Sequence, residues 1–333
     1  MARSYVTAAC LSVALFLGVS SAQGPLADNQ GPLADNQVNS LRRTLPASSD
    51  QPVLRVDSTL VTIPARITTI GGVPVTTLSK DNFRLFEDDI EQTIVHFGMD
   101  DVPVSIGILF DMSGSMGNKM LKACEAVKEF FKTANPADEF FLIKFNERVR
   151  LAVPFTTDPD AVYREVARIV PFGQTSLLDA INLAMKQMKK ARNPHQAIVI
   201  VSDGGDNWSR HSIREIKTAL MESDAQVFAL GIFDRDYMTK HAAEERRGPV
   251  LLDELAELTG GRHFPVDNLD DLPEISARLS REIRNQYELG YYSSNPARDG
   301  KYRRVKLTVK LAKPEDVSRL HADYRRGYYA PGK

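Results

Sequence analysis

One short segment of this chain combines a carboxylate and two hydroxyls in a spacing that suits the binding of a metal ion. Asp111-Met-Ser113-Gly-Ser115 places an oxygen-bearing side chain at every second residue, directly after the apolar run Val104–Phe110. The glycine inside the segment lets the backbone fold sharply, so the three oxygens can converge on one point. Oxygen ligands without nitrogen or sulfur favour a hard divalent cation, which here means Mg²⁺ or Mn²⁺, with Ca²⁺ also allowed.

Two later segments offer further oxygens of the same kind. Gly173-Gln174-Thr175-Ser176 precedes a helical pattern, and Ser202-Asp203-Gly204-Gly205 leaves an apolar strand. If both reach the edge of the sheet to which Asp111 belongs, their hydroxyl and carboxylate oxygens join those of Ser113 and Ser115 around one cation. Any one such segment alone is more often a turn or a helix cap, so the prediction depends on all three together.

The elements that must position these residues alternate between strand and helix. Apolar runs at 104–110, 140–145, 197–202 and 227–233 predict buried strands, and 149–155 predicts a hairpin partner. Helices are expected between them, one carrying Leu121, Cys124, Val127 and Phe131, and others opening at Asp158-Pro159 and at the capping box Ser212–Glu215. This alternation predicts an α/β fold with a doubly wound, mostly parallel sheet, whose ligands bind at the carboxyl ends of the strands.

The Asp-Met-Ser-Gly-Ser segment resembles the first part of the metal-ion-dependent adhesion site of von Willebrand factor A domains. Thr175 and Asp203 match the threonine and second aspartate segments of that site, and the resemblance covers roughly residues 102–286. It implies a Rossmann-like von Willebrand factor A fold. It also implies a bound divalent cation that captures an acidic side chain of a partner protein. We expect partner contacts from the polar residues around the site, namely Asn118, Gln174, Asp206, Asn207 and the single tryptophan, Trp208.

Segments 52–101 and 287–333 flank this domain and alternate apolar and polar residues in the manner of strands. We expect the two flanks to pair as one β-sandwich-like domain that the α/β domain interrupts. The stretch Gly71-Gly72-Val-Pro through Phe83-Arg-Leu-Phe, with Tyr287-Glu-Leu-Gly and Arg326-Gly-Tyr-Tyr, resembles the secreted von Willebrand factor A-related proteins of acidobacteria. That resemblance supports the architecture more than a function.

The N-terminus has the pattern of a secretory signal peptide. A charged start is followed by an apolar core from Ala8 to Val19 and by small residues up to Ala22, where we expect cleavage. Residues 23–51 contain Gly-Pro-Leu-Ala-Asp-Asn-Gln twice in tandem and are polar, which indicates a disordered linker. We therefore expect a secreted or periplasmic protein that keeps no transmembrane segment after cleavage.

Composition and missing motifs argue against several functions. A formal net charge of −1 with interspersed acidic and basic residues does not favour nucleic-acid binding. The serines lack a Gly-x-Ser-x-Gly elbow, and Gly114 to Lys119 lacks the spacing of a phosphate loop. We expect a protein-binding module and not an enzyme. Two alternatives stay open: an envelope scaffold with a structural metal, and a hydrolase that uses a metal-bound water.

Overall fold

The structure is a computed structural model that describes residues 60–99, 102–233, 247–311, 317 and 319–332. The expected signal peptide at 1–22, the expected linker at 23–51 and the start of the first β segment at 52–59 lie outside these residues. All described residues fall within one unit of the chain, Arg55–Lys333. In the part of the chain that is described, no helix combines the length and the apolar character needed to cross a membrane.

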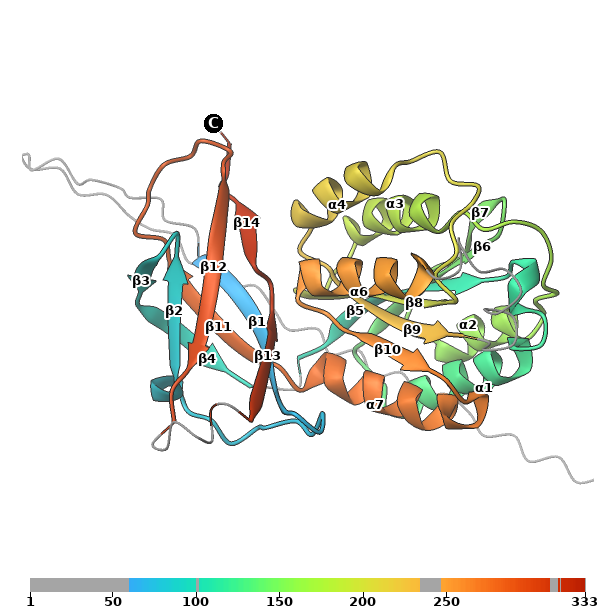
Figure 1. Cartoon of the computed structure of the whole chain (residues 1–333), viewed down its shortest axis with the longest axis horizontal. Helices are drawn as coiled ribbons and strands as arrows, with labels where there is room; N and C mark the ends of the chain where they lie inside the picture. The colour runs from blue at the N-terminus through green and yellow to red at the C-terminus, as the bar shows by residue number, and fades with distance from the viewer. Residues whose placement is uncertain (1–59, 100–101, 234–246, 312–316, 318, 333) are drawn as a thin grey trace, which may run out of the picture. The chain divides into compact units, whose positions relative to one another are not determined.

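A six-stranded sheet forms the centre of the α/β domain (Figure 1). Its strands pair in parallel, except that the edge strand β7 (Val149–Thr156) runs antiparallel to β6 (Glu139–Phe145). Every residue of the central strand is buried, as the continuous apolar run predicts for a strand covered on both faces. In spatial order the strands are β10 (His263–Val266), β9 (Gln226–Ile232), β8 (His195–Ser202), β5 (Val104–Asp111), β6 (Glu139–Phe145) and β7 (Val149–Thr156).

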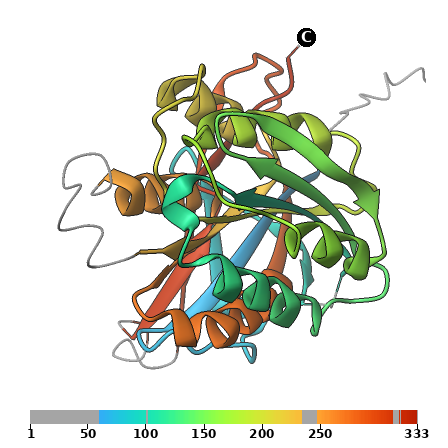
Figure 2. The same cartoon turned by 90° about the vertical axis from the view of Figure 1, so that its right-hand side faces the viewer.

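Helices cover both faces of this sheet, which confirms the predicted doubly wound α/β fold (Figure 2). Side chains of α1 (Met120–Phe131), α2 (Pro159–Val166) and α7 (Leu272–Arg284) enter the core on one face. Those of α3 (Leu177–Met188), α4 (Ile213–Met221) and α6 (Arg247–Thr259) enter the core on the other face. Three short 3-10 helices complete the described helical elements: η1 (Lys80–Asn82), η2 (Gly114–Met116) and η3 (Leu269–Asp271).

Local capping signals in the sequence mark the helix starts correctly. Asp158 caps α2 by accepting a hydrogen bond from the backbone of Asp160, and Ser212 forms the capping box with Glu215 at the start of α4. The prediction of which residues of α1 face the core is wrong for one residue, Leu121. Leu121 is 72% exposed, because α1 turns the face with Ala123, Val127 and Phe130 toward the sheet.

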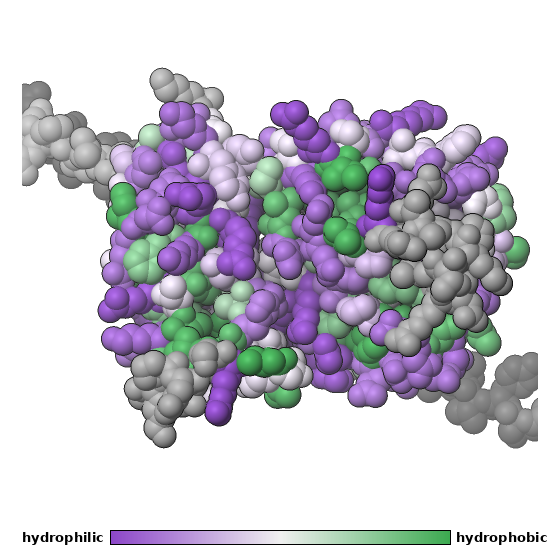
Figure 3. Space-filling model, viewed as in Figure 1, coloured by the Kyte–Doolittle hydropathy of each residue, from purple (hydrophilic) through white to green (hydrophobic). Residues whose placement is uncertain are grey.

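The flanking segments form two antiparallel sheets that share one core, as predicted for a sandwich built from both flanks (Figure 1). In each sheet, strands from before the α/β domain pair with strands from after it. One sheet has the order β13 (Leu320–Tyr324), β1 (Leu60–Thr69), β11 (Tyr287–Tyr292) and β4 (Ile94–Gly98). The other has the order β14 (Gly327–Tyr329), β12 (Tyr302–Val309), β2 (Phe83–Glu87) and β3 (Ile90–Gln92). Hydrophilic and smaller apolar areas are intermixed on the visible face (Figure 3).

The order in which strands are added to the central sheet reverses between β5 and β8. From β5 the chain first adds β6 and β7 on one side and later returns to add β8 on the other side. The two parallel neighbours β5 and β8 therefore send their following loops in opposite directions, and their carboxyl ends form the switch point at which open α/β sheets place a ligand crevice. Asp111 ends β5 and Asp203 follows β8, so the predicted ligand residues lie at this crevice.

Candidate metal centre

Backbone hydrogen bonds hold the three predicted segments together at the carboxyl edge of the sheet. The Gly114 N–H donates to the carbonyl of Gly173 at 3.0 Å. The N–H groups of Asn207 and Trp208 both donate to the carbonyl of Thr175 at 3.0 Å. The first segment is thus bonded to the second, and the second to the third.

Asp111 is fully buried, and both of its carboxylate oxygens are engaged. Oδ1 accepts from the Ser113 N–H at 2.8 Å, and Oδ2 accepts from the hydroxyl of Ser202 at 2.6 Å. Burial raises the pKa of Asp111 to about 7, with the negative charge of Asp203 adding to the shift and the hydrogen bonds from Ser113 and Ser202 opposing it. The carboxylates of Asp111 and Asp203 are thus close enough for a negative charge on one to oppose ionisation of the other.

The two hydroxyls of the first segment lie side by side. The Oγ atoms of Ser113 and Ser115 are 3.1 Å apart, and Ser113 is buried at the start of η2. The hydroxyls converge in the way that the alternating spacing predicts, because the short 3-10 helix after Ser113 turns Ser115 back toward it.

Asp203 is held by a lysine that no sequence pattern marks as a site residue. Its Oδ2 lies 3.2 Å from the ammonium of Lys119, whose side chain is 1% exposed. Its Oδ1 accepts from the Gly205 N–H at 3.2 Å. Lys119 precedes α1 by one residue, a place where a lysine is normally solvated. The sequence holds no local signal that it pairs with a carboxylate in the loop after β8.

Thr175 is buried, and its backbone is tied to the loop that follows β8. The side-chain oxygen of Asn207 accepts from the Thr175 N–H at 2.9 Å. Asp206 accepts from the Leu178 N–H at 3.3 Å and from the Ser209 hydroxyl at 2.6 Å, and burial raises its pKa. The side chains of Asp206 and Asn207, which we expected at a partner surface, thus bond the loop to the start of α3.

The remaining expected contact residues are exposed around the site. Trp208 is 59% exposed, and Asn118 and Gln174 are also exposed. Phe172, which is not among the contact residues expected from the sequence, is 54% exposed in the loop before Thr175. A single phenylalanine in a polar loop is not part of a helical or strand periodicity, so the sequence does not show whether it is exposed. Only the structure shows that Phe172 is exposed beside the candidate metal centre.

Two glycines make the loop shapes possible. Gly173 has φ +81° and Gly204 has φ +77°, backbone conformations that side chains rarely adopt. A Cβ atom on Gly204 would lie 2.6 Å from the carbonyl oxygen of Gly248 in α6. The segment after Asp203 can therefore pack closely against α6.

The donor set fits a hard cation. It consists of two carboxylates and neighbouring hydroxyls, and a positive group, the ammonium of Lys119, already lies against Asp203. Among the described residues, no group of three or more His, Cys, Asp or Glu side chains is placed to hold a metal. A cation in this crevice would consequently depend on hydroxyl oxygens as well as on Asp111 and Asp203.

Comparison with known proteins points to one domain type. Residues 106–205 match the model of the von Willebrand factor type A domain. Inter-alpha-trypsin inhibitor heavy chain H2 of Sus scrofa is 30% identical over 216 residues, which cover 58% of this chain and 22% of that protein. A UPF0353 protein of Mycolicibacterium paratuberculosis is 26% identical over 200 residues, 53% of this chain and 59% of that protein.

Solved structures include a similar chain described as von Willebrand factor type A from Catenulispora acidiphila. It shares 14% identity, has a TM-score of 0.48, and the match covers 82% of this chain and 74% of that one. This chain spans 22% of the length of the inter-alpha-trypsin inhibitor heavy chain. The residues that match the domain model, 106–205, contain strands β5, β6, β7 and β8 of the six-stranded sheet, so this part of the chain is similar to a von Willebrand factor type A domain.

Proposed function

We propose that this chain is a metal-dependent, adhesion-type protein-binding module that captures an acidic group of a partner protein. The observation that supports this most directly is the convergence of the buried carboxylates of Asp111 and Asp203 with the hydroxyls of Ser113 and Ser115 at the switch point of the sheet. The ammonium of Lys119 pairs with Asp203, whereas the buried carboxylate of Asp111 is bonded to an amide and a hydroxyl, so one buried negative charge would gain from a bound cation. We also propose secretion or periplasmic export, on the basis of the N-terminal sequence pattern.

The proposed ligands are Asp111, Ser113, Ser115, Thr175 and Asp203, and the proposed ion is Mg²⁺ or Mn²⁺, with Ca²⁺ as an alternative. When bound, the ion supplies positive charge and a coordination position for an outside carboxylate oxygen. Lys119 adds a further positive charge beside Asp203. The charge balance therefore favours an acidic partner group over a basic one.

The surroundings of the site suit a protein partner. Trp208 and Phe172 expose aromatic surface near the crevice, and aromatic side chains contribute strongly to the centres of protein interfaces. Gln174 and Asn118 add exposed polar groups on the neighbouring loops. We propose that these four residues contact the partner around the captured carboxylate.

Calorimetric titration of Mg²⁺ and of Mn²⁺ into metal-stripped protein tests the metal site. We expect saturable binding by the wild type and at least about tenfold weaker binding by Asp111→Asn, which keeps the shape of the side chain but removes its charge. Asp160→Asn, at an exposed aspartate of α2, serves as the matched control and should bind like the wild type. Equal heats from the wild type and Asp111→Asn would refute the site.

Partner capture is tested separately, with the wild type and Asp111→Asn immobilised and exposed to an envelope fraction of the producing cells. A protein that binds the wild type, is released by EDTA and is not retained by Asp111→Asn supports metal-dependent capture. If chelation lowers the melting temperature but releases no bound protein, the metal is structural and the scaffold alternative holds.

We further propose capture and not hydrolysis. The groups bonded to the two carboxylates are one serine hydroxyl, two backbone amides and a lysine, a set that orients the carboxylates. A panel of ester, phosphoester and peptide substrates, assayed with Mg²⁺ and with EDTA, tests this point. Metal-dependent turnover that disappears in Asp111→Asn would contradict it.

A further inference from the structure

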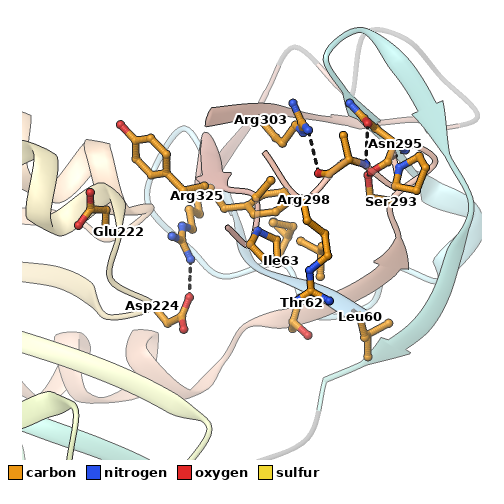
Figure 4. Close-up of a pocket in the computed structure, with 17 residues that line it drawn as sticks. Leu60, Thr62, Ile63, Glu222, Asp224, Ser293, Asn295, Arg298, Arg303 and Arg325 are labelled. Atoms are coloured by element: carbon orange, nitrogen blue, oxygen red, sulfur yellow. Dashed lines mark hydrogen bonds and ion pairs between the residues drawn. The ribbon is translucent and has the colours of Figure 1, made fainter. Parts of the chain in front are cut away.

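A pocket of about 400 Å³ lies away from the candidate metal centre. Its walls come from the start of β1, the loop after β11, the end of the chain after β13, and Glu222 and Asp224 in the turn before β9 (Figure 4). That turn lies at the amino end of β9, whereas Asp111 and Asp203 lie at the carboxyl ends of the parallel strands. The pocket and the metal centre are therefore at opposite edges of the sheet.

Most polar groups that line the pocket already have partners within the protein. Arg303 donates to Asp299 at 2.9 Å and to the carbonyl of Ala297 at 3.2 Å. Arg325 donates to Asp224 at 2.7 Å and to the carbonyl of Met221 at 2.8 Å. These two arginines shape the pocket, and their charges are balanced without a ligand.

Two hydroxyls of the lining are similarly engaged. Tyr328 and Ser293 both donate to the carboxylate of Glu87, at 2.8 Å and 2.5 Å. Glu87 is buried between the two sheets of the sandwich and also accepts from Tyr291 at 2.7 Å. This network fixes one wall of the pocket and leaves its two hydroxyl protons unavailable to a ligand.

Arg298 is different. Its side chain is exposed and extends across the pocket, with the guanidinium beside Thr62 and Leu60 (Figure 4). Within the described part of the chain, no carboxylate lies within ion-pair distance of it. The surface next to it is apolar and includes Leu60, which is 41% exposed, and Tyr329. An unbalanced guanidinium thus faces an apolar wall inside a concave site.

We propose that this pocket binds a small organic carboxylate with an apolar, preferably aromatic, body. A guanidinium pairs with a carboxylate through two parallel hydrogen bonds, and an apolar body would cover the wall formed by Leu60 and Tyr329. The volume is in the range of small-molecule sites. Arg298 brings a positive charge to its end of the pocket, whereas the carboxylate of Glu222 lines the other end, beside Asp224 and Arg325 (Figure 4). A singly charged carboxylate therefore suits the site better than a doubly charged phosphate. The assignment does not depend on the proposed metal-dependent function.

Calorimetric titration of 2-naphthoate into the full chain tests the proposal, with the neutral 2-naphthalenemethanol and with 2-naphthyl phosphate as comparison ligands. We expect saturable binding of naphthoate, and binding at least about tenfold weaker for the alcohol and for Arg298→Gln. Arg298→Lys keeps the charge but loses the paired hydrogen bonds, so its affinity for naphthoate should fall between those of the wild type and Arg298→Gln.

Two controls make the outcome specific. Arg150→Gln removes an exposed arginine of β7 that is not part of the pocket, and Asp111→Asn alters the candidate metal centre; both should bind naphthoate like the wild type. Equal affinity of Arg298→Gln and the wild type, or no saturable binding of naphthoate, would overturn the proposal. Tighter binding of the phosphate than of naphthoate would overturn the choice of a carboxylate.

Discussion

The ammonium of Lys119 is buried beside Asp203, and this residue gives the first prediction. Replacing it by methionine leaves the carboxylates of Asp111 and Asp203 together without that positive charge, so the metal-free protein should lose about 3 kcal/mol of unfolding free energy. If a cation binds these carboxylates, saturating Mg²⁺ should raise the melting temperature of Lys119→Met more than that of the wild type.

Thermal unfolding with EDTA and with Mg²⁺ measures both effects. Lys128→Met is the matched control, because Lys128 is an exposed lysine on the same helix, α1. Should Lys119→Met unfold at the same temperature as Lys128→Met in EDTA, the pair with Asp203 contributes nothing to stability.

Asp179 gives a pH-dependent prediction. Burial opposes its ionisation, but hydrogen bonds from the His211 ring, at 2.5 Å, and from the backbone of His211 and Arg210 outweigh burial and lower its pKa below 3.8. A carboxyl group whose pKa is lowered by folding stabilises the fold at pH values above its unfolded-state pKa. This stabilisation is lost as the pH falls through the folded-state pKa.

We therefore expect Asp179→Asn to cost about 2 kcal/mol at pH 7 and progressively less between pH 5 and pH 3. Urea unfolding of the wild type and the variant across that range measures the difference, with Asp160→Asn as the control. A difference that stays constant with pH would show that ionisation of Asp179 is not the cause.

At the scale of elements, the packing of β5 against β6 depends on one glycine. A Cβ atom on Gly107 would lie 2.2 Å from the ring of Phe141, which is fully buried on the neighbouring strand. We expect Gly107→Ala to destabilise the protein by about 1–3 kcal/mol, because the ring cannot move without displacing the core.

Chemical denaturation measures this cost. Gly71→Ala is the control, since its nearest neighbour would be 3.8 Å away in a loop of the sandwich. Equal stability of the two alanine variants would show that the β5–β6 contact yields more easily than the structure indicates.

Helices and strands of the α/β domain were the most predictable part of the fold. Asp158, Ser212 and Glu215 are short-range signals, and each acts within the helix that it begins. The exposure of Leu121 was not predictable in the same way, because an apolar residue in the first turn of α1 fits more than one assignment of the buried face.

At the scale of the whole molecule, one buried arginine joins the sandwich to the α/β domain. Arg66 of β1 donates to Asp323 at 2.7 Å, and its Nε lies 3.3 Å from Glu282 of α7, without the alignment of a hydrogen bond. Its side chain is 1% exposed and that of Glu282 is fully buried. The guanidinium carbon also lies 5.4 Å from the centre of the Phe228 ring.

We predict that Arg66→Met costs about 3 kcal/mol and uncouples the two domains, because it leaves buried carboxylates with fewer positive partners. In calorimetry, the unfolding transition of Arg66→Met should be broader than that of the wild type, or divided in two. Arg304→Met removes an arginine whose ion pair with Asp89 is exposed, so its transition should stay at the temperature of the wild type. A single, unshifted transition for Arg66→Met would contradict the coupling.

Two kinds of information can be separated in this protein. The sequence alone determined the alternation of strands and helices and the pairing of the flanks, because periodicity and capping report local structure. Its resemblance to the von Willebrand factor A metal site supplied the candidate ligands Asp111, Ser113, Ser115, Thr175 and Asp203, which stay a prediction. Only the tertiary structure decided that Lys119 pairs with Asp203, that Arg66 joins two domains, and that Arg298 faces a pocket without a partner. These contacts join residues far apart in the chain, and charge partners at such separations depend on how the elements pack.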